Sequence, residues 1–418
     1  MKARAWYRAL PWLAAALLVA LAPILFRSGF ALTLMSQMGI AILFALSYNM
    51  LLGQTGLLSF GHAVLLGLGG FIAMHALRAI DGGELPLPVP FLPLVGALGG
   101  LGFGALFGYL ATRRAGTAFS MITLGLAELV AASSLTLRVF FGGEEGINGD
   151  RTGGPAFLGL DLGPQIEVYY TIAIWGFLGV GAMYALSRTP LGRMALAVRE
   201  NAERVAFIGY DPGRIRFLMF TFSGFFAGLA GGLYAINYEI VTGVNLGTQA
   251  SGLVLLMTYI GGVGHFIGPI LGAILMTFLQ INLASYTDAW ILYLGLLFIA
   301  MVMFAPQGIA GLILMHEPLW RARLLHRLVP SYAMALGPAA LLALGVVLIV
   351  EMSYRLSLAA DKGPLIPVFG IEADARSFLS WGVALALVLG GAFLLRVVGP
   401  RVAERWRDLM GMARGGAV

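Results

Sequence analysis

The sequence contains no cysteine and very few lysines, and only 11% of its 418 residues are charged. The missing cysteines exclude disulfides, thiolate metal sites and cysteine nucleophiles. Neither Lys2 nor Lys362 follows a glycine-rich phosphate-binding loop, so the chain carries no Walker-type ATPase motif of its own. Soluble domains average about 25% charged residues. The scarcity of charge therefore argues against a water-soluble protein.

Apolar residues make up 59% of the chain, and its mean hydropathy is +0.89. A helix that crosses a bilayer needs about 20 apolar residues. The sequence therefore predicts an all-α, polytopic transmembrane bundle of about twelve spans. These predicted spans are 11–27, 30–52, 57–79, 90–111, 117–139, 168–187, 217–237, 248–262, 267–283, 288–305, 333–352 and 377–396. The spans at 248–262 and 267–283 are short and glycine-rich, which indicates broken helices.

The positive charges fall mainly between alternate spans. With the N-terminus inside, most of the 26 Lys and Arg residues lie in the inner segments, as the positive-inside rule requires. Both termini are therefore predicted to be cytoplasmic, and the net charge of +6 indicates membrane orientation instead of nucleic-acid binding. The N-terminus also has features of a signal peptide, with a cleavage-like motif at 20–22, but Pro23 favours a retained first helix.

A glycine-rich join between two predicted spans concentrates polar side chains. Its polar members are Gln54, Thr55, Ser59 and His62, followed by further glycines. Unwound backbone and small residues allow close approach by a substrate or by a neighbouring helix. The join therefore predicts either a substrate pathway lined by these four side chains or a site of close helix packing.

Glu128 lies within the predicted span 117–139, where a charged group is costly and is a functional candidate by default. At 100° per residue, Ser120, Thr123 and Ser134 fall on the same arc of the helix as Glu128. That polar stripe predicts a face turned to the bundle interior. Glu128 is interpreted as a structural partner of a neighbouring helix or as a residue of the substrate pathway.

The longest inner loop, 187–216, predicts a short helix from Leu196 to Gly209. Asp211 followed by Pro212 predicts the start of the next helix. A helix of small apolar and charged residues outside the membrane favours docking onto a soluble partner, and the alternative is a helix that rests on lipid headgroups.

A second glycine-rich break with a histidine lies at 261–269, as an internal repeat would give. The sequence shows no metal-ligand spacing, no Ser-His-Asp pattern and no paired carboxylates. We therefore expect no metal, no cofactor and no enzymatic activity of the chain itself.

The stretches 53–70, 188–234 and 261–273 and the ending 304–312 resemble the permeases of branched-chain amino-acid ABC transporters. The resemblance is closer to the second of the two permease types in that system and covers about residues 30–312. It implies a heteromeric importer of the bacterial inner membrane. In such an importer two permeases form the pathway, cytoplasmic ATP-binding subunits drive transport, and a periplasmic solute-binding protein delivers the solute.

The resemblance also implies a coupling helix around Glu203 to Gly209 that enters a groove on the ATPase. ABC importers carry a Glu-Ala-Ala motif with a glycine six residues after the glutamate. Glu203 and Gly209 keep that spacing, whereas Arg204 and Val205 replace the alanines. The implied coupling residues are Arg199, Glu200, Glu203, Arg204 and Gly209.

The expected domains are a first transmembrane helix at 1–29, a permease core at 30–315 and an extension at 316–418 with two more spans and a basic tail. The expected function is import of branched-chain or other hydrophobic amino acids by alternating access. Related permeases import urea or short amides, which leaves that substrate class as one alternative. An ion-coupled secondary transporter acting alone, with Glu128 as its proton site, is the other.

Overall fold

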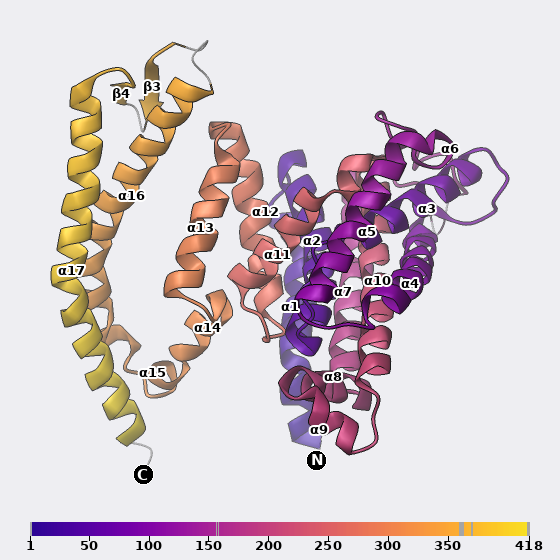
Figure 1. The fold of residues 1–418 in the computed structure, drawn as a ribbon, viewed down its shortest axis with the longest axis horizontal. Helices are drawn as coiled ribbons and strands as arrows, with labels where there is room; N and C mark the ends of the chain where they lie inside the picture. Colours follow the sequence, from indigo (N-terminus) through magenta and orange to yellow (C-terminus); the bar gives the residue numbers. More distant parts are fainter. Residues whose placement is uncertain (1, 156, 158, 359–362, 369–370, 416–418) are drawn as a thin grey trace. The chain divides into compact units, whose positions relative to one another are not determined.

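The computed structural model describes residues 2–155, 157, 159–358, 363–368 and 371–415, and nearly all of its regular structure is helical (Figure 1). The chain forms two compact units. The first comprises the described residues up to Asn282 together with Leu296–Ala310, and the second comprises Leu283–Gly295 and the described residues from Gly311 onward. The expected domain boundaries at 29 and 315 stay a prediction.

Among the described residues, nine helical segments are long and apolar enough to cross a membrane. They are α2 (Gly29–Thr55), α3 (Ala63–Asp81), the turn η1 (Val89–Phe91) with α4 (Leu92–Ala111), α5 (Thr117–Thr136), α7 (Gln165–Arg188), α10 (Pro212–Tyr238), α12 (Gly268–Tyr286), α16 (Val329–Ser357) and α17 (Phe378–Gly415). A tenth is counted if the bent pair α13 (Trp290–Phe304) and α14 (Gly308–Met315) with α15 (Glu317–Arg321) forms one span. The predicted all-α polytopic class is confirmed.

Each of the twelve predicted stretches coincides with a helix, but the count of twelve spans stays a prediction. Two of the stretches fall short on length. In α1 (Lys2–Leu25) the apolar part begins only at Leu10, and α11 (Thr248–Gly261) has 14 residues. At about 1.5 Å per residue, α11 is shorter than the hydrocarbon core of a bilayer, which is about 30 Å thick.

Short elements complete the chain. They are α6 (Arg138–Phe141), β1 (Ile147–Asn148), α8 (Pro190–Glu200), α9 (Ala202–Phe207), β2 (Ile240–Val241), η2 (Gly243–Leu246), η3 (Leu325–Arg327), β3 (Leu365–Val368) and β4 (Ile371–Asp374). β1 pairs antiparallel with β2, placing Ile147 opposite Val241. β3 pairs antiparallel with β4 and joins α16 to α17.

Both predicted breaks are observed. Helix α2 ends at Gly56, whose φ of +70° lies in the left-handed region that favours glycine, and an irregular stretch precedes α3. Helix α11 ends at Gly262 with φ +118°, and Gly264 with φ +93° follows before α12 begins. At both breaks the backbone therefore adopts positive φ values at residues that the sequence makes glycine.

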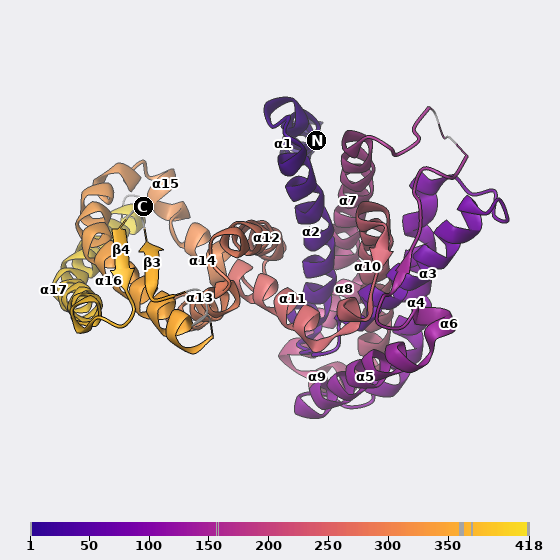
Figure 2. The ribbon, with the colours of Figure 1, turned by 90° about the horizontal axis from the view of Figure 1, so that it is seen from above.

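Helix α10 is packed backbone-to-backbone against α4 at the centre of the first unit (Figures 1 and 2). A Cβ atom added at Gly100 would lie 2.2 Å from the carbonyl oxygen of Gly224, and one added at Gly228 would lie 2.3 Å from that of Gly96. Helix α3 approaches from another side, since a Cβ at Gly231 would lie 2.1 Å from the carbonyl oxygen of Leu66. Small residues allow such close helix contacts in membranes.

The second unit is built on the antiparallel pair α16 and α17. These helices also meet through glycine, because a Cβ at Gly345 would lie 2.9 Å from the carbonyl oxygen of Ala384. Near the chain end, Leu319 and Leu328 form a buried cluster with Leu409 of α17. The hydroxyl of Tyr293 donates a hydrogen bond of 2.9 Å to Glu351, a carboxylate within a predicted span.

The close packing of α4 and α10 gives a stability prediction. We expect Gly100→Ala to lower the free energy of unfolding by about 1–3 kcal/mol, because the added methyl group would overlap the α10 backbone. The measurement is the thermal midpoint of the purified protein in detergent. Gly102→Ala on the same helix is the matched control, since no atom lies within 4 Å of its added Cβ. Equal midpoints for the two variants would contradict the packing argument.

Candidate functional site

His62 ends the irregular stretch between α2 and α3, and its side chain is completely buried. Its Nε2 atom lies 3.0 Å from the hydroxyl of Ser47. The ring stacks on Phe44 at a centroid distance of 5.5 Å and meets the ring of Tyr48 edge-on at 5.2 Å. These contacts make His62 part of the packing between the start of α3 and the C-terminal half of α2.

The backbone groups freed by this break are bonded by side chains from other helices. The amide of Phe60 donates to the hydroxyl of Thr123 at 3.2 Å, and the hydroxyl of Ser120 donates to the carbonyl of Leu58 at 2.7 Å. The amide of Ala63 donates to the hydroxyl of Ser251 on α11 at 3.0 Å. Irregular backbone at membrane depth needs such partners. The buried part of the polar stripe on α5 therefore supports the break.

The other side chains predicted for the pathway lie at the same break. The hydroxyl of Thr55 donates to the carbonyl of Leu51, one turn back in α2, at 2.6 Å. Ser59 is buried and Gln54 is partly buried. Within the described part of the chain, neither the Ser59 hydroxyl nor the Gln54 carbonyl oxygen has a hydrogen-bond partner. The structure thus brings the four predicted residues to one break, where His62, Thr55 and Ser59 are shielded from solvent.

Glu128 lies apart from this buried stretch, on the exposed side of α5. Its carboxylate accepts a hydrogen bond from the hydroxyl of Thr248 at the start of α11. The contact joins α5 to α11, as a structural partner would. The same carboxylate is exposed on a helix that is long and apolar enough to cross a membrane, and a charge on such a helix is costly in lipid.

The predicted helix from Leu196 to Gly209 is wrong in one respect, because it is two helices. Asn201 has an extended backbone, with φ −158° and ψ 99°, and its side chain accepts a hydrogen bond from the amide of Arg204. Asn201 therefore ends α8 and caps α9. The predicted start of the next helix is confirmed, since the Asp211 side chain caps α10 and Pro212 is its first residue.

The surface formed by α9 and the turn after it carries both charged and apolar side chains. Glu200, Glu203 and Arg204 are exposed, and Gly209 adopts a φ of +91°. The largest exposed apolar side chain beside them is Phe207, which is 89% exposed. Ile208 and Tyr210 are also exposed and extend this patch. Contiguous exposed apolar groups of this kind mark interaction surfaces.

Arg199 differs from the other residues predicted for ATPase coupling, because it is directed toward the chain's own helices. Its Nη1 atom donates to the carbonyl of Gly53 in the last turn of α2. A Cβ at Gly56 would lie 3.2 Å from its Cγ, and a Cβ at Gly264 would lie 3.4 Å from its Nη1. One side chain of α8 therefore reaches both glycine-rich breaks.

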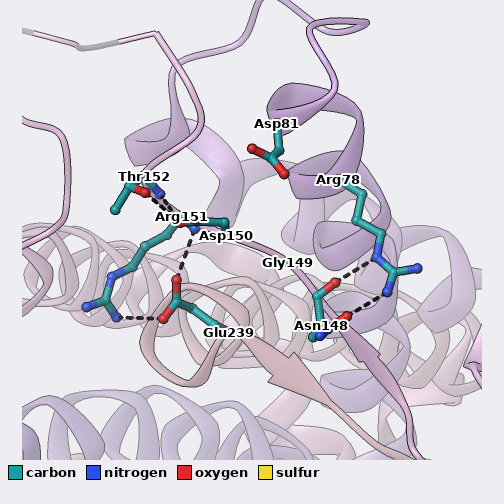
Figure 3. Close-up of a pocket in the computed structure, with 8 residues that line it drawn as sticks. All are labelled: Arg78, Asp81, Asn148, Gly149, Asp150, Arg151, Thr152 and Glu239. Carbon is teal, nitrogen blue, oxygen red and sulfur yellow. Dashed lines mark hydrogen bonds and ion pairs between the residues drawn. The ribbon is translucent and has the colours of Figure 1, made fainter.

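A polar pocket of about 700 Å³ lies at the end of α10 that is opposite to α8 and α9 (Figure 3). Its lining residues come from the end of α3, from β1 and the stretch after it, and from the residue that follows α10. They are Arg78, Asp81, Asn148, Gly149, Asp150, Arg151, Thr152 and Glu239. The sequence does not predict this pocket. The lining residues are spread over three distant stretches, so no local motif indicates it.

Comparison with known proteins gives one family and several relatives. The family model described as branched-chain amino acid transport system, permease component, matches residues 30–306. The chain is 29% identical over 296 residues to the permease proteins LivM of Salmonella typhimurium and Escherichia coli, named as parts of a high-affinity branched-chain amino acid transport system. Each match covers 65% of this chain and 67% of the relative.

A relative named for a different solute is the fructose import permease protein FrcC of Rhizobium meliloti. It is 27% identical over 256 residues, which cover 55% of this chain and 67% of the relative. No solved structure matches the chain significantly.

The packing of His62 predicts a loss of stability when the ring is removed. We expect His62→Ala to lower the free energy of unfolding by about 2–4 kcal/mol, because a buried ring is replaced by a cavity. The thermal midpoint in detergent measures this loss. The exposed His326 supplies the control variant His326→Ala, which we expect to melt as the parent does. A His62→Ala protein with the parent's midpoint but impaired transport would instead support the pathway role.

Proposed function

Because the chain belongs to the family of permease components of branched-chain amino acid transport systems, we propose that it imports branched-chain or other hydrophobic amino acids. It is a multi-pass inner-membrane permease subunit of an ABC transporter. Members of this family are not themselves enzymes, so the energy for transport comes from ATP-binding subunits. We propose that these subunits sit in the cytoplasm, with a periplasmic solute-binding protein on the opposite side.

The observation that carries the proposal is the α8–α9 segment. It connects the two membrane-spanning helices α7 and α10 and presents Glu203, Arg204 and Phe207 away from the first unit. A soluble subunit that binds this surface would bury Phe207 and pair with the two charges. Burial of an aromatic anchor inside a polar rim is the usual basis of a stable interface.

Arg199 supplies a route from that surface into the membrane. The last carbonyls of a helix have no partner within the helix and carry partial negative charge, so a guanidinium at Gly53 stabilises the end of α2. A displacement of α9 moves α8, and with α8 the arginine that contacts α2 and the α11–α12 break. Motion of the ATPases is thereby transmitted to the two places where the helices are interrupted.

Glu128 favours a second permease subunit over a chain that works alone. An exposed carboxylate on a membrane-spanning helix is costly in lipid, and its cost falls when protein or a water-filled pathway covers it. The α5 face that carries Glu128 and Gly125 is open in this chain. A partner permease seated there would place Glu128 beside the pathway between the two subunits.

The relatives are named for different solutes, so the substrate of this chain is proposed separately from its role as a permease. The LivM proteins are named for branched-chain amino acids and FrcC for fructose. We favour amino acids because the family model and the LivM matches agree on them. Urea and short amides are the alternative within the same kind of permease.

The function is tested by uptake of L-leucine into vesicles that contain the chain, its ATP-binding subunits and its second permease, with the solute-binding protein outside. We expect uptake to require ATP. The double variant Glu203→Ala/Arg204→Ala should reduce uptake and stimulated ATP hydrolysis at least about fivefold, because both charges leave the docking surface.

The matched control is Glu317→Ala/Arg321→Ala, which removes an exposed Glu–Arg pair outside the residues that match the family model. Unchanged coupling in the Glu203 and Arg204 variant would count against the docking role. Uptake by the chain alone, driven by a proton gradient without ATP, would replace the proposal with a secondary transporter.

Arg199 gives a separate prediction about coupling. We expect Arg199→Ala to lower the amount of solute imported per ATP hydrolysed about tenfold, because the charge-assisted bond to the end of α2 is lost. Arg199→Lys keeps a cation and should retain part of the coupling. Arg193→Ala, an exposed position on the same helix α8, is the control. If Arg199 instead contacts the ATPase, its alanine variant will lose assembly with the ATP-binding subunits while the coupling ratio stays normal.

A further inference from the structure

The polar pocket and the α8–α9 segment lie at opposite ends of the same helix. Asp211 caps the start of α10, and Glu239 follows its end and lines the pocket. The 27 residues of α10 span about 40 Å, more than the hydrocarbon core of a bilayer. If the α8–α9 segment binds ATPases in the cytoplasm, the pocket therefore opens on the outer side, where solute arrives.

Two opposite charges in the pocket are close in sequence but do not pair. Arg78 and Asp81 are three residues apart on the last turns of α3, a spacing that puts side chains on neighbouring positions. Arg78 is held instead by Asn148, through a 2.6 Å bond from Nε to the carbonyl oxygen and a 2.8 Å bond from Nη2 to Oδ1 (Figure 3). Three of its five N–H groups are left over.

The Asp81 carboxylate lines the pocket and has its Oδ1 against Gly153, where an added Cβ would lie 1.8 Å from that oxygen. Within the part of the chain that the structure describes, no hydrogen bond or ion pair engages it, and Figure 3 shows it directed into the pocket. The pocket therefore contains a free anion and a partly free cation that the fold keeps apart.

The rest of the lining fixes the shape of the pocket. Glu239 adopts a left-handed φ of +54°, which is strained for a residue with a side chain. Its carbonyl accepts from the amide of Gly149 at 3.1 Å, and its Oε1 accepts from the amide of Arg151 at 3.1 Å. The guanidinium of Arg151 is in turn bonded to the carbonyl of Leu162 at 2.7 Å.

Asp150 adds a second anion to the lining. The hydroxyl and amide of Thr152 donate to its carboxylate, and these bonds lower the pKa of Asp150 below its ordinary value. Asp150 is therefore ionised at neutral pH and makes the pocket more attractive to a cation.

We propose that this pocket binds the zwitterionic part of an amino acid, with Asp81 accepting from the ammonium group and Arg78 donating to the carboxylate. The inference rests on the proposed function and names the chemistry by which an amino acid is received on the outer side. The lining is polar, so it recognises the backbone that amino acids share and leaves the side chain unselected. A neutral sugar can offer only hydroxyl hydrogen bonds to these two side chains and has no charge to pair with either.

The charges are exposed, so the binding is weak. Two exposed ion pairs contribute little free energy in water, which corresponds to a dissociation constant of about tens of millimolar or weaker. Weak binding suits a site that receives solute from a binding protein and passes it on, because a transported solute has to leave as well as enter.

The test is direct binding to the purified full-length chain in lipid nanodiscs without its binding protein, measured by saturation-transfer NMR. The probes are L-leucine, leucinamide, 4-methylpentanoate and fructose. We expect L-leucine to bind best, since the second and third probes each lack one charge, and we expect fructose, which has no charge, to bind most weakly. Asp81→Asn should weaken L-leucine binding about fivefold, and Arg78→Gln should weaken it similarly.

The matched control is Glu84→Gln, which removes an exposed carboxylate just beyond the end of α3 without touching the pocket lining. It should leave L-leucine binding unchanged. Thermal midpoints of all three variants show whether each one folds as the parent does. Asp81→Asn keeps the shape of the side chain, so it tests the inference even if Arg78→Gln disturbs the stretch that begins at Asn148.

Equal L-leucine binding by the parent and Asp81→Asn would overturn the inference. So would a variant that binds L-leucine normally but loses only its affinity for the loaded binding protein, because the pocket would then be a protein-docking surface. In both cases ATP-driven L-leucine uptake can remain intact, and the proposed function would stand. ATP-driven uptake of fructose alone would overturn the proposed function instead.

Discussion

The close contact between the glycine faces of α4 and α10 is the constraint on which the first unit depends. Gly100 and Gly228 allow the two backbones to meet where even one methyl group would overlap. Lipid offers no hydrophobic driving force between helices, so such packing must come from van der Waals contact at short range. It fixes α10 at the centre, with α3 seated against it through Gly231. The ends of α10 then determine where the α8–α9 segment and the polar pocket lie.

Polar contacts act in a second way, by supporting the places where helices are interrupted. Ser120 and Thr123 of α5 and Ser251 of α11 bond the backbone between α2 and α3. Arg199 bonds the last turn of α2 from outside the membrane-spanning part. The breaks are therefore ordered by neighbouring helices. A change in the position of α5, α8 or α11 changes their support.

The sequence predicts the features that local chemistry determines. Long apolar runs predict the helices, left-handed glycines such as Gly56 and Gly262 mark the breaks, and Asp211 before Pro212 predicts the start of α10. The break at Asn201 was missed because an asparagine at that point can cap a helix or sit within one, and only the tertiary packing of α8 decides between them.

Features that depend on pairing between distant segments could not be predicted. His62 is predicted either to line the pathway or to take part in helix packing, and nothing in the sequence indicates that its ring meets Ser47 on the facing helix. Arg199 has the same charge as its neighbours, and only the fold shows that it contacts Gly53. The pocket needs Asp81, Asp150 and Glu239 together. The close packing of α3 against α10 brings Asp81 to the end of α10, and the pairing of β1 with β2 brings Asp150 beside Glu239.

Helix α3 links the two regions for which a role in transport is proposed. It begins directly after His62 at the supported break and ends with Asp81 in the polar pocket. Its 19 residues span about 28 Å as one helix without an internal proline. A helix of that kind moves as a rigid body, so a shift at the break also shifts Asp81. The pocket and the break therefore lie at the two ends of one helix, an arrangement that would couple them in a permease that opens alternately to its two sides.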